Sequence, residues 1–251
     1  MWKFSLCLVL AGWLFSSAGS VLAANFKAES GVQQNLLLEL YTSQGCSSCP
    51  PADDWLSELK QDPRLWKTIF PVAFHVDYWN YIGWNDPFST ERYSNRQRRY
   101  ASSGNVSSVY TPGFIANGRE WRSWFRRRDI NTAISDIQSN PGKLSLSLDE
   151  QQLHVSFKPS IEVPKKLVLN AAWLSMNIKT EVLNGENGGK TLRHDFVCRD
   201  WQVIEAKLEN GHYQWQQAID SQRLNKADAL VVWVSTADNP APIQSSGLQL
   251  K

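Results

Sequence analysis

Hydrophobic residues follow two different patterns along the chain, and the change between them falls near residue 141. Before that point, short continuous apolar runs alternate with stretches of helical spacing, whereas after it apolar and polar residues alternate one by one. The first pattern is typical of strands buried on both faces of a sheet and joined by helices. The second is typical of antiparallel strands with one face in a core. We therefore expect an α/β protein whose second part is β-rich.

The first part predicts the order strand, helix, strand, helix, strand, strand, helix. Trp55, Leu56 and Leu59 have the spacing of one helix face, and Asn117-Gly118 is the strongest two-residue hairpin signal. The expected elements are strands at residues 36–41 and 69–76, helices at 51–61 and 90–100, a hairpin at 114–121, and a third helix from Asp129 to about residue 140.

The second part predicts strands separated by turn clusters such as Asn187-Gly188-Gly189. The expected strands are residues 144–148, 153–157, 167–174, 196–204, 213–219 and 230–235. Such short strands suggest a small antiparallel sandwich or sheet. The tail from Asp238 is rich in proline and serine and is expected to be loose. We therefore expect one domain at residues 24–141 and a smaller antiparallel β-rich domain at 142–251.

The first 23 residues have the pattern of an export signal. Lys3 precedes an apolar stretch at residues 6–15, and Val21-Leu22-Ala23 is a small-residue cleavage site. The apolar stretch is too short for a permanent membrane-spanning helix. Cleavage after Ala23 predicts a secreted or periplasmic protein with no stable membrane span, and an uncleaved anchor is the alternative.

The net charge limits the classes of partner that the sequence favours, and the cysteine content bears on the compartment. A net charge of +2 favours neither nucleic acid nor an anionic membrane. The single basic run, residues 119–128, is expected to be a solvated face or to meet an acidic partner, not to bind nucleic acid. Cys7 lies within the signal, so Cys46, Cys49 and Cys198 remain in a compartment where disulfides persist. The sequence does not indicate an oligomeric state.

The strongest chemical signal is the C-x-x-C pair, Cys46 and Cys49. Two thiols at this spacing, where a strand gives way to a helix, indicate a redox pair or a metal pair. A helix N-terminus favours the thiolate, so we expect Cys46 to be the nucleophile and Cys49 the resolving thiol. Pro51 makes the first turn irregular or delays the helix, and Asp53 and Asp54 oppose the thiolate, so the predicted activation is moderate.

The element order, with Cys46 at the first junction of strand and helix, resembles the thioredoxin fold. Three motifs carry a closer resemblance: TSQGCSSCPPAD at residues 42–53, HVDYWNYIGWNDPF at 75–88 and VYTPGF at 109–114. They are similar to the secreted bacterial family catalogued as a thioredoxin-like domain of unknown function, and Gly185-Glu186-Asn187 extends the likeness. The resemblance implies a thioredoxin-like fold and leaves the reaction open. Gly45 departs from thioredoxins, which carry tryptophan before the first cysteine.

The resemblance also implies roles outside the cysteine pair. Thioredoxin-like proteins have a cis proline before the third strand, packed against the redox pair, so Thr111-Pro112 is expected to be cis and to orient a substrate backbone. Thioredoxins keep a carboxyl behind the resolving cysteine as a proton relay. Glu39, an acidic residue in an apolar strand, is the candidate, and a hydrogen-bonded structural Glu39 is the alternative.

The loop at residues 77–89 is rich in aromatic residues. Trp79 and Trp84 are expected to wall a substrate cleft, and the alternative is that they pack the loop onto its own domain. His75, at the end of the second strand, is either structural or able to reach the cysteines as a base or as a third metal ligand. Cys198 lies in an alternating apolar segment and is expected to be buried and inert, with a third redox thiol as the alternative.

Thiol–disulfide exchange with extracytoplasmic protein or small-molecule thiols is the function that these features favour, with no cofactor. One alternative is a copper(I) carrier that uses Cys46, Cys49 and His75, because thiolate and imidazole ligands suit that ion. The other is a non-enzymatic binding protein in which the oxidised pair is a structural staple.

Overall fold

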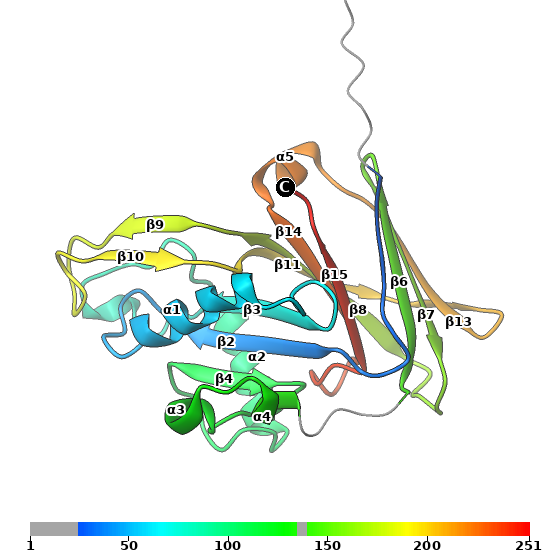
Figure 1. Ribbon diagram of the computed structural model, residues 1–251, viewed down its shortest axis with the longest axis horizontal. Coiled ribbons are helices and arrows are strands. Elements are labelled where there is room, and N and C mark those ends of the chain that lie inside the picture. Colours follow the sequence, from blue (N-terminus) through cyan, green and yellow to red (C-terminus); the bar gives the residue numbers. More distant parts are fainter. Residues whose placement is uncertain (1–24, 135–139) are drawn as a thin grey trace, which may run out of the picture.

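The computed structural model describes residues 25–134 and 140–251 (Figure 1). The expected signal at residues 1–23 and the end of the third expected helix lie outside the described residues. The described chain is a mixed α/β structure with two large sheets and few helices.

The larger sheet has eight strands in the order β15-β14-β8-β11-β3-β2-β4-β5. These strands are β2 (Leu36–Thr42), β3 (Ile69–His75), β4 (Gly113–Ala116), β5 (Arg119–Glu120), β8 (Leu167–Ser175), β11 (Val197–Glu205), β14 (Ala229–Thr236) and β15 (Gln244–Gln249). β2 and β3 are parallel, and β4 runs antiparallel to β2. Every residue of β2 and β3 is buried, as their continuous apolar runs predict.

Strands from both sides of residue 141 belong to this sheet. β11 joins β3 in parallel through Val197 and Ala73, and β8 and β14 follow β11 as antiparallel neighbours. The sequence analysis did not foresee this continuity, because alternation shows which face of a strand is buried but not which strand it pairs with.

The second sheet has five antiparallel strands in the order β1-β6-β7-β13-β12. They are β1 (Asn25–Glu29), β6 (Gly142–Asp149), β7 (Gln152–Pro159), β12 (Lys207–Glu209) and β13 (His212–Ala218). Buried apolar residues alternate with more exposed polar residues along β6 and β7, as predicted. They pack against alternate residues of β8 and β14, including Leu169 and Val232, and this core separates the two sheets.

α1 (Pro50–Glu58) and α2 (Glu91–Ser102) lie on opposite faces of β2. Thr42 donates a hydrogen bond to Asp53 of α1, whereas Glu39 forms an ion pair with Arg96 of α2. Residues separated by an odd number of positions on a strand point to opposite faces. α1 continues as the short 3-10 helix η1 (Leu59–Gln61), so the helical segment ends at residue 61, as predicted.

The remaining helices are short. They are η2 (Asn80–Ile82), α3 (Trp124–Arg127), α4 (Asn131–Ile134) and α5 (Ser221–Lys226). α4 begins where the third helix was expected, because the Asp129 carboxylate accepts the Asn131 N–H at 2.9 Å. Arg128 has a left-handed backbone, with φ of 50°, and separates α4 from α3.

The prediction of a loose C-terminal tail was wrong. β15 pairs with β14 from Gln244 to Gln249, and Gln244, Ser245 and Ser246 are buried. The sequence of β15 lacks apolar alternation, so its place in the sheet depends on partners rather than on its own pattern. The hairpin strands β9 (Ile178–Glu181) and β10 (Thr191–His194) were also not foreseen.

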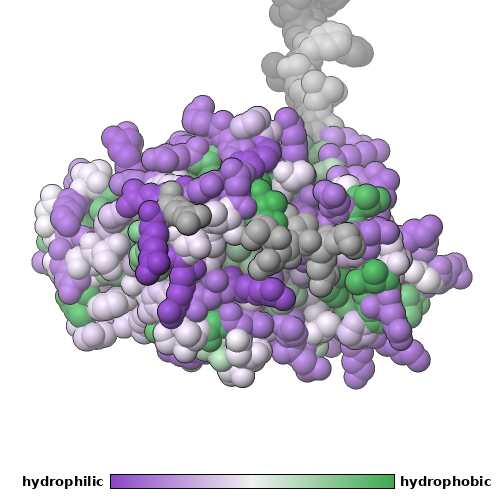
Figure 2. Space-filling view, turned by 60° about the horizontal axis from the view of Figure 1, so that its bottom comes forward, coloured by the Kyte–Doolittle hydropathy of each residue, from purple (hydrophilic) through white to green (hydrophobic). Residues whose placement is uncertain are grey.

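The surface view in Figure 2 shows a face on which hydrophilic residues predominate and hydrophobic residues form small separate groups. The large apolar side chains are mostly within the two cores. None of the helices in the described part of the chain is long and apolar enough to cross a membrane.

Candidate functional site

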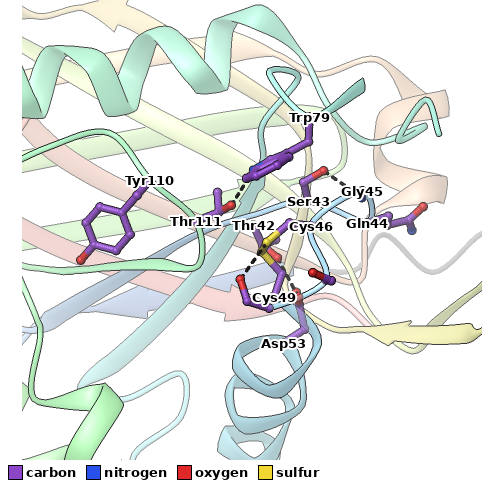
Figure 3. Close-up of a disulfide and its surroundings, with 12 residues drawn as sticks. Thr42, Ser43, Gln44, Gly45, Cys46, Cys49, Asp53, Trp79, Tyr110 and Thr111 are labelled. Carbon is purple, nitrogen blue, oxygen red and sulfur yellow. Dashed lines mark hydrogen bonds between the residues drawn. A yellow bond between two sulfur atoms is a disulfide. The ribbon is translucent and has the colours of Figure 1, made fainter. Parts of the chain in front are cut away.

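Cys46 and Cys49 are joined by a disulfide in the turn between β2 and α1 (Figure 3). α1 begins at Pro50, so Cys49 is its N-cap residue and Cys46 lies in the preceding turn. The Cys49 N–H donates to the Cys46 carbonyl at 3.2 Å. Because Cys46 lies outside the helix, it receives less of the helix dipole than a cap residue would, as Pro51 indicated.

The disulfide is buried, which the sequence did not reveal. Cys46 is 1% exposed and Cys49 is 0% exposed, although Ser47 and Ser48 between them are exposed. The Cys46 Sγ lies 3.3 Å from the Ser48 Oγ. A thiolate can therefore reach either sulfur only after neighbouring residues move aside.

The loop that connects β9 and β10, residues 182–190, is fastened to the cysteine turn. The Asn187 side chain is fully buried and donates to the carbonyls of Gln44 and Cys46 at 2.9 and 3.0 Å. The exposed Glu186 carboxylate accepts the Ser47 N–H at 3.0 Å. These contacts make the β9–β10 loop the cover of the cysteine turn.

The expected aromatic and proline residues lie beside the same turn. Trp79 packs closely against Gly45, where an added Cβ would lie 3.2 Å from the Trp79 carbonyl oxygen. The Trp79 indole donates to the Thr111 Oγ1 at 2.7 Å (Figure 3). The Thr111-Pro112 bond is cis, as expected. The Trp84 indole donates to the Gln44 Oε1 at 3.0 Å. Both tryptophans are partly exposed, so each presents some ring surface to solvent.

Glu39 lies on the opposite face of β2 from α1. Its carboxylate accepts hydrogen bonds from Arg96 at 2.7 and 2.9 Å, from Tyr41 at 2.9 Å and from Tyr100 at 2.6 Å. Glu39 and Arg96 are both at most 1% exposed. Burial alone would lower the pKa of Arg96, but the adjoining Glu39 carboxylate raises it. These contacts favour the structural alternative for Glu39 over the proton relay.

A polar cluster lies buried next to the cysteine turn. Asp53 accepts from the Thr42 Oγ1 at 2.7 Å through one carboxylate oxygen and contacts the His194 Nδ1 at 3.2 Å through the other. The His75 Nδ1 lies 2.7 Å from the Asp86 carboxylate, and the two imidazole rings are 4.9 Å apart between centroids. The sequence analysis assigned no role to Thr42, Asp86 or His194.

The hydrogen-bond partners assign the proton positions. The Gln44 Oε1 accepts from Trp84, so the Gln44 Nε2 is the donor towards the His194 Nε2 at 3.2 Å. The His194 Nδ1–H therefore donates to Asp53. Burial alone would lower the pKa of His75, but the Asp86 carboxylate raises it. The pKa of Asp86 is lowered because His75 and the N–H groups of Gln44 and Phe88 outweigh its own burial.

His75 does not join the cysteines. Among the described residues, the group able to hold a metal ion is Asp53, His75 and His194, and it includes neither Cys46 nor Cys49. His194 and Asn187 were the functional candidates that the sequence analysis missed. Asn187 belongs to the Gly185-Glu186-Asn187 motif, which could have indicated its role. His194 lies in β10, a strand that was not predicted.

Cys198 is expected not to react in the folded protein. Its thiol is buried, and burial raises its pKa to about 12. At pH 8 about one thiol in ten thousand is then ionised, and the thiolate is the reactive form. Iodoacetamide treatment of native, reduced protein should leave Cys198 intact, as measured by peptide mass, whereas the same treatment of unfolded protein should modify it. An adduct on Cys198 under native conditions would show that this thiol is accessible.

Two solved structures are similar in fold. The crystal structure of protein AGR_C_4864 from Agrobacterium tumefaciens has a TM-score of 0.62 and 23% identity, over 86% of this chain and 94% of that chain. HBP35 of Porphyromonas gingivalis has a TM-score of 0.62 and 15% identity, over 88% of this chain and 76% of that chain. At these identities the likeness concerns the fold alone.

No curated protein matches the chain. A family described as "Protein of unknown function (DUF1223)" matches residues 37–235, the stretch that contains the cysteine turn, the aromatic loop, the cis proline and the β9–β10 loop. The match confirms the resemblance that the three sequence motifs carried. The chain therefore belongs to the DUF1223 family.

Proposed function

We propose that this protein is a thioredoxin-like thiol–disulfide oxidoreductase that acts outside the cytoplasm on protein or small-molecule thiols. The observation that carries the proposal is the disulfide between Cys46 and Cys49 at the junction of β2 and α1. The order β2-α1-β3-α2-β4-β5 supports the thioredoxin-like assignment, with parallel β2 and β3 and with cis Thr111-Pro112 just before β4.

The reaction needs only the two cysteines and a substrate disulfide. In the reducing direction, the Cys46 thiolate attacks one substrate sulfur, forms a mixed disulfide and releases the other substrate sulfur as a thiolate, which takes up a proton. The Cys49 thiolate then attacks Cys46, releases the second substrate sulfur and restores the Cys46–Cys49 disulfide. Oxidation of a substrate dithiol is the same sequence reversed.

The surroundings of the turn suit a substrate chain. Trp79 and Trp84 offer partly exposed ring surface, and Thr111 is held beside Trp79 by the indole hydrogen bond. A substrate segment that lies along Thr111-Pro112 would have its sulfur near Cys46. Because both sulfurs are buried, the proposal requires the β9–β10 loop to open first.

The same burial supports a second candidate, a structural disulfide in a non-enzymatic binding protein. Both sulfurs are covered, and the turn that holds them is tied down by Asn187. The geometry does not favour the copper(I) carrier. Among the described residues, His75 contacts Asp86, Phe88 and His194 rather than either cysteine.

An insulin-reduction assay with dithiothreitol separates exchange from the staple. The wild-type protein should accelerate precipitation of the insulin B chain, and Cys46→Ser should reduce the rate to that of dithiothreitol alone. Cys198→Ser is the matched control and should retain the wild-type rate, because the Cys198 thiol is buried and its pKa is raised. A glutathione titration should also give a reversible equilibrium for the pair.

The outcome against the proposal is equally defined. A wild-type rate equal to that of Cys46→Ser, together with a cysteine pair that does not equilibrate with glutathione, would reject thiol–disulfide exchange and support the structural disulfide. Circular dichroism of each variant establishes that the comparison is made between folded proteins.

A further inference from the structure

The geometry points to a divalent transition-metal site, suited to Zn²⁺, formed by Asp53, His75 and His194. Each residue offers one ligand atom, these atoms lie within 4.8 Å of one another, and all three residues are buried. The site is separate from the cysteine pair and does not depend on its redox role. The residues come from α1, β3 and β10, so an ion would join three elements that surround the cysteine turn.

His75 supplies the first independent observation. Its Nδ1 is held by Asp86 at 2.7 Å, but its Nε2 is buried and has no hydrogen-bond partner among the described residues. A buried polar nitrogen without a partner is costly and uncommon. Metal-binding histidines characteristically donate one ring N–H to a carboxylate and bind the ion through the other nitrogen. Asp86 and His75 have this arrangement.

The Asp53 carboxylate is likewise held in position by a neighbouring residue and has one oxygen directed towards the cluster. One carboxylate oxygen accepts the Thr42 hydroxyl at 2.7 Å, which fixes the plane of the group. Within the described part of the chain, the other oxygen has one hydrogen-bond contact, to the His194 Nδ1 at 3.2 Å, a distance near the upper limit for a hydrogen bond. A bound ion would replace this contact with two metal–ligand bonds. The His194 ring would stay neutral, because its proton would pass from Nδ1 to Nε2, and the Gln44 amide would then have to turn its oxygen towards Nε2.

The donor set selects the kind of ion. Two imidazoles and one carboxylate suit Zn²⁺ and similar first-row divalent ions. Ca²⁺ and Mg²⁺ prefer oxygen ligands throughout, and copper(I) prefers sulfur, which this cluster lacks. The charge also fits, because the buried carboxylates of Asp53 and Asp86 together balance one dication when both histidines are neutral.

The spacing permits binding after small side-chain rotations. Ligands at 2.0–2.1 Å in a tetrahedral Zn²⁺ site lie about 3.3 Å from one another. Atoms within 4.8 Å of one another must therefore approach by about 1.5 Å or less. The His75 and His194 rings are nearly perpendicular, at 77°, so the two imidazoles approach the shared position from different directions.

Metal titration of the folded, oxidised protein tests the site. After treatment with EDTA and removal of the chelator, the wild-type protein should bind one equivalent of Zn²⁺ in competition with a chromogenic chelator. Co²⁺ should give the intense visible absorption of a tetrahedral site at the same stoichiometry. Absence of stoichiometric binding of both ions by folded wild-type protein would overturn the inference.

Variants locate the ion. His194→Ala should abolish the stoichiometric Co²⁺ spectrum. Asp86→Asn replaces the carboxylate partner of His75 with an amide and should weaken affinity about 10- to 100-fold. His154→Ala is the matched control, because His154 is exposed on β7. It should bind as the wild type does.

The double variant Cys46→Ser, Cys49→Ser separates this site from the cysteines. Unchanged Zn²⁺ binding supports the cluster of Asp53, His75 and His194. Loss of Zn²⁺ binding in the folded double variant would indicate that the ion binds at the cysteine pair and would reject the proposed site. Because the readout is metal stoichiometry, it is independent of whether the protein reduces insulin.

Discussion

Arg96→Ala is expected to lower the free energy of unfolding by about 3–5 kcal/mol, because it leaves a buried carboxylate without its counter-ion. Arg96 donates two hydrogen bonds to Glu39, and both residues are at most 1% exposed. Tyr41 and Tyr100 would still donate to Glu39, but neither supplies a positive charge. For a chain of this size, such a loss lowers Tm by roughly 6–20 °C. Thermal unfolding followed by circular dichroism measures the change.

Arg98→Ala is the control for this prediction. Arg98 lies on the same helix but is exposed, so its removal should change stability by no more than about 0.5 kcal/mol. Replacing both charges, as in Arg96→Met with Glu39→Leu, should recover part of the lost stability, since no unpaired charge is then buried. If Arg96→Ala were as stable as Arg98→Ala, the structural role of the ion pair would be refuted.

Asn187→Ala is expected to accelerate reduction of the Cys46–Cys49 disulfide by about tenfold or more. The substitution removes the two hydrogen bonds that fasten the β9–β10 loop to the carbonyls of Gln44 and Cys46. A lost buried hydrogen bond costs about 1–3 kcal/mol, and each 1.4 kcal/mol changes an opening equilibrium tenfold. The measurement is the rate of reduction by dithiothreitol at fixed pH, followed by alkylation and mass analysis.

Asn184→Ala serves as the matched variant. Asn184 lies in the same loop but is exposed, so the reduction rate should stay at the wild-type value. Equal rates for Asn187→Ala and Asn184→Ala would mean that the β9–β10 loop does not limit access to the disulfide. The proposed exchange reaction would then need another route to Cys46.

The local pattern of the sequence was sufficient to predict most elements of the first half. The apolar runs of β2 and β3 are buried on both faces, and Asn117-Gly118 forms the turn between β4 and β5. The cis bond at Thr111-Pro112 was predicted from the resemblance, not from propensity. The buried strands and the turn depend on residues that are close in sequence, and the cis bond was predicted from a motif shared with a known fold.

The features that were missed depend on residues far apart in the sequence. Asn187 reaches the Gln44 carbonyl across 143 positions, and His194 reaches Asp53 across 141. No periodicity in a single segment encodes such a pairing. The residue type of Glu39 left a proton relay and a structural role open. Its ion pair with Arg96 of α2, 57 positions away, favours the structural role.

The end of the chain holds the beginning of β2 in place, and this has a consequence for folding. The Asn35 side-chain amide donates to the Ser245 carbonyl at 2.8 Å, and the Asn35 backbone N–H donates to the Gln244 Oε1 at 2.9 Å. β1 likewise pairs with β6, more than a hundred residues later. Such a topology has a high contact order and folds slowly. Asn35, which leads into β2 and the cysteine turn, therefore meets these partners only after residues 244 and 245 have been synthesised.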